Sequence, residues 1–218
     1  MSRFPLRAAA RVTLAALGLF ILAMLAAMAS YPGGSWTAPE ASGFSLARNF
    51  WCDLLRSQAI NGADNATGKR LASLAFAALG VALWPYWWVA ASALPPARRR
   101  LVSYLGTASA ACLAAMTLLP SDRFALAHGV VALGGGFLGM WAAAASVAVR
   151  VPGERRFAAR RSAGALALLF AAANAVLYVH VAYLKGPETV AQPIAQKLAT
   201  LFLLTWMFAT IRQARRVD

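Results

Sequence analysis

The chain has 218 residues, of which 61% are hydrophobic and 13% are charged, and its formal net charge is +14. Soluble domains contain about a quarter charged residues, so this composition excludes an ordinary water-soluble globular protein. The mean hydropathy of +0.61 indicates instead a chain that lies largely in lipid.

Six apolar runs follow one another along the chain. Each reaches the roughly 20 residues that an α-helix needs to cross a bilayer core of about 30 Å. The sequence therefore predicts an all-α fold, a polytopic transmembrane bundle of six helices that forms a single integral membrane domain over residues 1–218. The predicted spans cover residues 12–31, 71–93, 101–120, 124–149, 162–184 and 192–211.

The first span also has features of a signal peptide. A basic segment precedes it, and Ala27, Met28 and Ala29 form a small-x-small cleavage pattern. The apolar stretch of residues 12–30 is nonetheless long enough to cross the bilayer. We expect this span to be retained.

The basic residues predict the orientation of the bundle. With the amino terminus inside, the inner segments hold 14 of the 21 Lys and Arg residues and two acids, and the outer segments hold seven basic residues and five acids. This asymmetry follows the positive-inside rule, so both termini are predicted to be cytoplasmic. We attribute the high positive charge to the orientation of the bundle and to contact with anionic membrane lipids, and not to nucleic-acid binding. The bias toward Ala and Arg is typical of a GC-rich bacterial genome and predicts a bacterial inner (plasma) membrane protein with a periplasmic outer face.

Two aromatic segments suggest contact with the membrane interface. Residues 84–88, WPYWW, are predicted to form an aromatic belt at the inner end of the second span. The segment FSLARNFWCDLLRS, residues 44–57, mixes apolar and charged side chains in a pattern that suits a helix lying in the membrane surface. We expect a short amphipathic helix over residues 45–57 in the first periplasmic loop.

Polar side chains within the spans are the best functional clue, because they cost free energy in a bilayer unless they have partners. His128 and His180 lie on separate spans, each about 6 Å below the outer end of its helix at 1.5 Å per residue. Asn49, Cys52 and Asp53 of the first outer loop lie on the same side of the membrane.

Two interpretations of these residues remain open. In one, His128, His180 and either Asp53 or Cys52 bind a metal ion, with zinc the best match to these donors, and leave one position for an activated water. In the other, the side chains only hydrogen-bond to neighbouring helices and lipid headgroups. A haem is a less favoured ligand, for which the two histidines would be the axial ligands.

Two glycines of the fourth span suggest close packing between helices, and the two cysteines are not expected to pair. Gly135 and Gly139 have the i, i+4 spacing that lets helix backbones approach closely, within one chain or in self-association or a complex. Cys112 lies near the middle of the third span and Cys52 at the outer surface, so no disulfide between them is expected.

The order of the motifs resembles a known family. "YPGG" after the first span, then "GFSLARNFWCDLL" and five more spans, is similar to the bacterial membrane-protein family catalogued as domain of unknown function 998. Those proteins have six spans and a motif that looks like Asn-x-x-Ser-Asp-Leu. Asn49, Cys52, Asp53 and Leu54 would match it, with Cys52 where the family usually has Ser.

This resemblance also suggests a distant relation to a group of membrane enzymes. The family is sometimes grouped with ceramidase-like and progestin-receptor-like membrane proteins, many of which look like metal-dependent amide hydrolases. That group uses three histidines with an Asp and a Ser, whereas this chain has only His128 and His180.

Three functions are therefore considered. The favoured one is an integral inner-membrane protein with an outer-face polar site, non-catalytic or lipid-binding. The first alternative is a zinc-dependent membrane hydrolase of lipid amides or esters, in which Asp53 or Cys52 completes the metal site and Tyr183 or Asn174 orients substrate. The second alternative is a structural subunit of a membrane complex that packs through Gly135 and Gly139.

Overall fold

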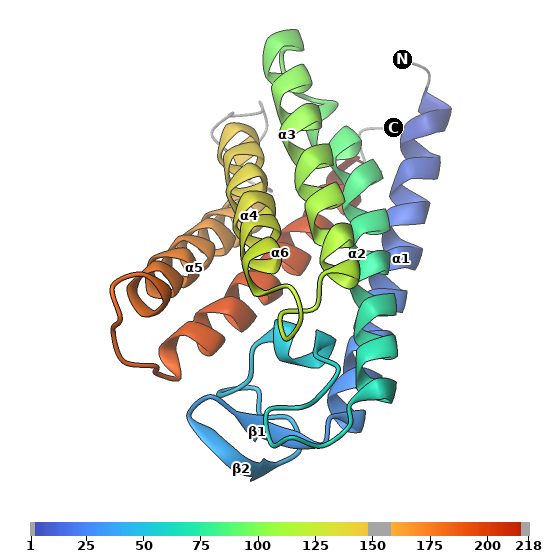
Figure 1. The fold of residues 1–218 in the computed structure, drawn as a ribbon. Coiled ribbons are helices and arrows are strands. Elements are labelled where there is room, and N and C mark those ends of the chain that lie inside the picture. The colour runs from blue at the N-terminus through green and yellow to red at the C-terminus, as the bar shows by residue number, and fades with distance from the viewer. Residues whose placement is uncertain (1–2, 148–157, 215–218) are drawn as a thin grey trace.

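The structure is a computed structural model that describes residues 3–147 and 158–214. Six helices in these residues are long and apolar enough to cross a membrane, one for each predicted span, so the all-α bundle of a multi-pass membrane protein is confirmed. Figure 1 shows both described termini at one end of the bundle, which we call the terminal end. The helices are α1 (Arg3–Ser30), α2 (Ala66–Ala91), α3 (Pro96–Ala115), α4 (Ala125–Val147), α5 (Ala158–Ala182) and α6 (Ala191–Ala214).

The basic residues of the predicted inner segments can be placed only in part. Arg98, Arg99 and Arg100 begin α3, and Arg160 and Arg161 begin α5, all at the terminal end. Five further arginines of the predicted inner segments lie outside the described residues: Arg150, Arg155, Arg156, Arg215 and Arg216.

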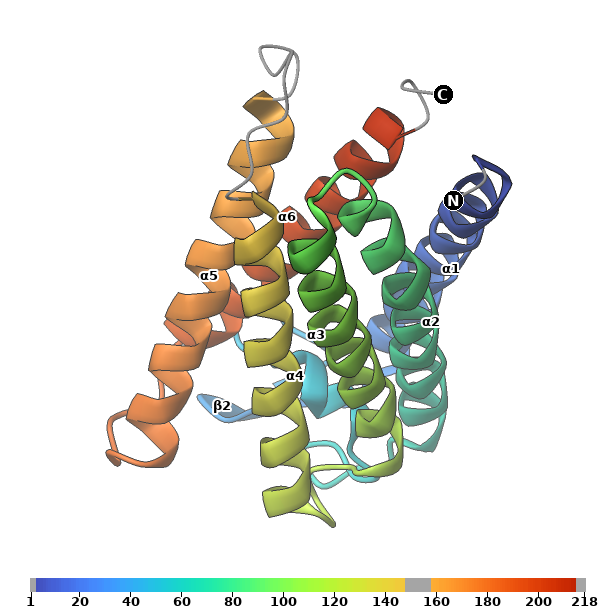
Figure 2. The same ribbon diagram turned by 90° about the horizontal axis from the view of Figure 1, so that it is seen from above.

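The first four helices pack side by side in chain order, as both views of the ribbon show (Figures 1 and 2). Small side chains make this close packing possible, since lipid supplies no hydrophobic force between helices. Ala72, Ala75 and Ala82 of α2 are completely buried. The Thr13 hydroxyl of α1 donates a hydrogen bond of 3.2 Å to the Ala82 carbonyl.

The last two helices pack mainly on each other. Their Phe170 and Phe202 rings stack with centroids 5.6 Å apart. Both helices run obliquely to α4, and α5 diverges from α4 away from the terminal end (Figure 1).

A compact cap covers the other end of the bundle. It contains the antiparallel strands β1 (Gly33–Ser35) and β2 (Ala38–Ser42) and the short 3-10 helix η1 (Trp51–Leu55). Residues 45–57 therefore do not form the expected amphipathic helix lying in the membrane surface, and their helical part is the short 3-10 helix η1. Asp53, Leu54 and Leu55 are buried against the bundle instead of lying along the membrane surface.

Two buried asparagines explain this departure from a helix. The side-chain Oδ1 of Asn49 accepts the Ser45 N–H at 2.9 Å, and its side-chain Nδ2 donates to the Gly34 carbonyl at 2.7 Å. The Asn65 amide nitrogen donates to the carbonyls of Leu54 (3.1 Å) and Arg56 (3.0 Å). Such side-chain bonds to backbone groups compete with helical hydrogen bonds.

The irregularity within β1 also requires glycine. Gly34 has a φ of +82°, and a Cβ there would overlap the backbone of Asn61. The two-stranded sheet was not predicted from the sequence.

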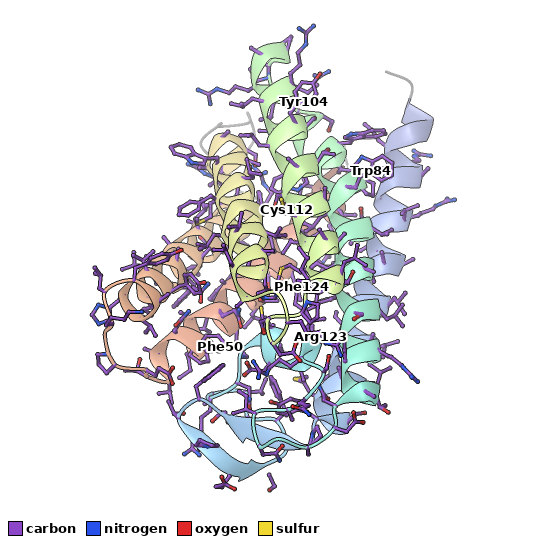
Figure 3. The ribbon with its side chains drawn as sticks, viewed as in Figure 1. Phe50, Trp84, Tyr104, Cys112, Arg123 and Phe124 are labelled. Atoms are coloured by element: carbon purple, nitrogen blue, oxygen red, sulfur yellow. The ribbon has the colours of Figure 1, made fainter. Side chains whose placement is uncertain are left out.

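The prediction of an aromatic belt at residues 84–88 is only partly correct. Trp84 is 55% exposed and points outward from α2, as Tyr104 does from α3 (Figure 3), and Trp88 is also exposed. Tyr86 and Trp87 are instead buried, because their rings pack against Trp206 of α6 and the Trp87 ring also packs against Gly106 of α3.

The glycines of α4 pack within the chain. A Cβ on Gly135 would lie 2.9 Å from the Cys112 Cβ, and one on Gly139 would lie 2.8 Å from the Ser109 Oγ. The Ser109 hydroxyl donates to the Gly135 carbonyl at 2.7 Å. These glycines thus face α3, which is one of the two uses expected for them, and Cys112 is a free cysteine at this contact.

Gly106→Ala should destabilise the bundle, because a Cβ there would overlap the buried Trp87 ring. Forcing a side chain into a packed core costs about 1–3 kcal/mol. Thermal unfolding in detergent, followed by size-exclusion chromatography, measures the effect. Gly134→Ala is the matched control, since nothing lies within 4 Å of its added Cβ and alanine favours the helix. Equal melting temperatures for the two variants would contradict this packing.

Candidate functional site

A cavity of about 620 Å³ lies between α1–α4 and the α5–α6 pair, under the cap. This volume is within the range of about 300–1,000 Å³ typical of small-molecule sites. Along α4 the wall extends from Ala125 to Ala143, about 27 Å at 1.5 Å per residue. The cavity therefore runs through most of a bilayer core, which is about 30 Å thick.

Most of the wall is apolar. Phe20 and Met24 of α1, Phe76 and Leu79 of α2 and Leu113 of α3 contribute to it, and most of the rest comes from α4, α5 and α6. At the terminal end, Trp87 and Trp206 line the cavity with their rings in an edge-to-face contact at 6.0 Å. Such a wall accommodates hydrocarbon rather than water.

Polar side chains gather toward the cap. They come from η1 and its flanks and from three different helices, and Phe50 accompanies them at the cap side (Figure 3). The polar and charged lining residues at this end include Arg48, Cys52, Asp53, Arg56, His128, Asn174, Tyr178, Gln192, Gln196 and Thr200.

Asp53 is held by the cap itself. Its Oδ2 accepts the Phe50 N–H at 2.8 Å and the Asn49 amide at 3.0 Å. Burial raises the pKa of Asp53 above its ordinary value, although these two hydrogen bonds oppose the shift. The carboxyl group is therefore a structural acceptor within the cap as well as a lining residue.

Cys52 is a thiol in this environment. Burial, assisted by the neighbouring Asp53 carboxylate, raises the pKa of Cys52 to about 12. The thiolate is the form that attacks substrates and binds metals. At neutral pH Cys52 is therefore in its unreactive form.

The cap is fastened to α6 by residues that the sequence analysis did not select. The Trp51 backbone N–H donates to Gln196 Oε1 at 2.9 Å, and its indole N–H donates to Thr200 Oγ1 at 3.0 Å. The Lys197 ammonium donates to the Asn49 carbonyl and lies 4.7 Å from the centroid of the Trp51 ring. Lys197 could have been noticed as a cation within an apolar span, because such residues are rare unless they have a partner.

The two histidines are not brought together. His128 is 6% exposed and lines the cavity, and its Nδ1 lies 2.6 Å from the Leu119 carbonyl oxygen. His180 lies exposed in the last turn of α5 and is not a lining residue. Tyr183 also lies off the cavity and is 63% exposed, whereas Asn174 lines it.

The metal hypothesis gains no support from this geometry. Within residues 3–147 and 158–214, no three His, Cys, Asp or Glu side chains form a group that could hold a metal ion. Zinc and haem stay predictions.

Comparison with known proteins gives no match to any family model, curated protein or solved structure. The class that the fold defines is a multi-pass integral membrane protein. The likeness to domain of unknown function 998 stays a prediction.

Asp53→Ala should destabilise the cap, because it leaves the Phe50 N–H and one of the two N–H groups of the Asn49 amide without an acceptor. Each buried group left unpaired costs about 1–3 kcal/mol. Asp53→Asn keeps an oxygen for both donors and should cost less. Thermal unfolding of both variants and the wild type measures the difference.

The same variants test the charge of Asp53. A raised carboxyl pKa contributes stability that is present at acid pH and lost as the pH rises through the folded-state value. The melting temperature of the wild type relative to Asp53→Asn should therefore fall from acid to neutral pH. A wild-type advantage that grows with pH would refute this assignment.

Proposed function

We propose that this protein is a non-catalytic integral membrane protein that binds a lipid in the cavity between α4 and the α5–α6 pair. The observation that carries the proposal is the cavity, with its long apolar wall along the membrane and its polar residues collected under the cap. A lipid has the same division into an apolar chain and a polar head. Its chain would lie along the apolar wall, and its head would lie against the polar residues under the cap.

Access from the bilayer supports a lipid as the ligand. Gly136 and Phe137 of α4 line the cavity and are also exposed on the surface of the bundle. They lie on the helix from which α5 diverges (Figure 1). A lipid chain could therefore enter sideways without crossing the cap.

In the orientation we propose, the terminal end is cytoplasmic and the cap is periplasmic, in the inner membrane of a bacterium. The support is the set of arginines at the starts of α3 and α5, since positive charge collects on the cytoplasmic side. The polar end of the cavity would then lie in the outer leaflet. Its ligand would come from that leaflet.

Gly136→Phe should reduce lipid binding, because the new ring would occupy the cavity. Gly134→Phe is the matched control: it makes the same change on the same helix, at a position that does not line the cavity. Nothing lies within 4 Å of a Cβ at either glycine, so both variants should fold. The measurement is the amount of lipid per chain after detergent purification and extraction, by mass spectrometry.

The expected result is stoichiometric lipid in the wild type and in Gly134→Phe, and a several-fold loss in Gly136→Phe. Equal lipid in the two glycine variants would mean that the bound lipid lies on the outer surface of the bundle. That result would overturn the proposal.

A further inference from the structure

Two hydrogen-bond acceptors in the cavity wall lack a partner. They are the Nε2 atom of His128 and the Oδ1 atom of Asn174, both buried and without a hydrogen bond in the described residues. Both residues line the cavity. A buried polar atom without a partner costs free energy, so a ligand that turns either side chain toward the cavity and donates a hydrogen bond to that atom would be favoured.

The role of the His128 nitrogen follows from its other contact. A carbonyl oxygen can only accept, so the 2.6 Å contact with Leu119 means that Nδ1 carries the proton. In the neutral imidazole Nε2 then has only a lone pair. It can accept a hydrogen bond from a ligand but cannot donate one.

His128 and Asn174 belong to one polar strip. Tyr178 is four residues from Asn174 and so lies on the same face of α5. Its hydroxyl is 3.0 Å from the point where a Cβ on Gly129, the neighbour of His128, would stand. Tyr178 therefore lies at the contact between α4 and α5, beside Gly129.

We infer that the ligand is a lipid with an uncharged headgroup that donates hydrogen bonds, of the kind that a glycerol bearing one acyl chain presents. This inference rests on the proposed function. Two hydroxyl groups would satisfy His128 Nε2 and Asn174 Oδ1, and the chain would lie along the apolar wall. Trp87 and Trp206 also have indole N–H groups without a partner, but these are donors at the opposite end and do not compete for the headgroup.

Charged headgroups fit this strip less well. A carboxylate or phosphate would bring further lone pairs against the two acceptors. An ammonium group could donate, but the charged lining residues near the cap are Arg48 and Arg56 together with Asp53 and Glu188, so they offer a cation no net attraction.

The arginines provide the rival headgroup site. Arg48 is exposed, and Arg56 already donates to the Gln58 carbonyl and lies over the Trp36 ring. An exposed charge such as Arg48 contributes little to binding in water, and the half-buried Arg56 is already engaged with Gln58 and Trp36. If they determined the ligand, an anionic lipid would bind best.

The test compares three probes with one common oleoyl chain: monooleoylglycerol, oleic acid and oleoyl lysophosphatidic acid. Each is titrated into the purified full-length protein after delipidation and followed by native mass spectrometry. Wild type should bind monooleoylglycerol most tightly. Asn174→Leu should weaken that binding about five- to tenfold, the effect of losing one hydrogen bond, and should leave oleic acid binding unchanged.

Asn174→Leu is suited to this test, because the substitution removes an atom that already lacks a partner and so breaks no contact of Oδ1. His128→Phe is the second variant and should have the same selective effect. Its melting temperature is measured alongside, since it also loses the bond to Leu119.

The outcomes separate the inference from the proposed function. Tighter binding of lysophosphatidic acid, unaffected by Asn174→Leu, would assign the headgroup to the arginines and overturn the inference. Equal binding of all three probes that is lost in Gly136→Phe would also overturn it, while the lipid cavity would stand. No binding of any probe, together with no co-purified lipid, would refute the proposed function itself.

Discussion

The structure depends on one buried side chain, Asn49. Its amide joins β1, the turn before η1 and Asp53 through three hydrogen bonds, and its backbone carbonyl accepts the Lys197 ammonium of α6. Every polar group of a buried residue must find a partner, and here the partners come from four separate parts of the chain. The cap therefore has a defined shape and a defined attachment to the last helix.

That attachment explains why a bundle of six helices contains a cavity. The first four helices pack through alanines and glycines, which bring backbones together and leave little space. The α5–α6 pair approaches them differently, with Trp51 and Lys197 fixing α6 to the cap while α5 diverges from α4. The cavity lies in the space between the two groups of helices, under the cap.

The six spans could be predicted from the sequence, because length and hydropathy are local properties. Burial within a span is harder to predict. Trp84 and Trp88 are exposed while Tyr86 and Trp87 are buried, and the difference depends on Gly106 and Trp206 in other helices. A cluster of aromatic residues near a helix end does not reveal which of them face a neighbour.

The site shows the same limit. Cys52, Asp53, His128 and Asn174 were selected because they are polar and were predicted to lie on the outer side of the membrane, and the structure places all four in the wall of one cavity. His180 satisfied the same criterion but lies exposed, since depth does not determine which face of a helix a residue occupies. The contacts of Trp51 with Gln196 and Thr200 join residues about 150 positions apart, so no local pattern could indicate them.

The long separation of these contacts has a consequence for biogenesis. The segment that forms the cap emerges from the ribosome directly after the first span, but its partners on α6 are synthesised last. Helices that pair in chain order can associate during insertion, whereas contacts between distant parts of a chain form late. The docking of α6 is thus the step that completes the chamber, and molecules of the surrounding leaflet are present when it closes.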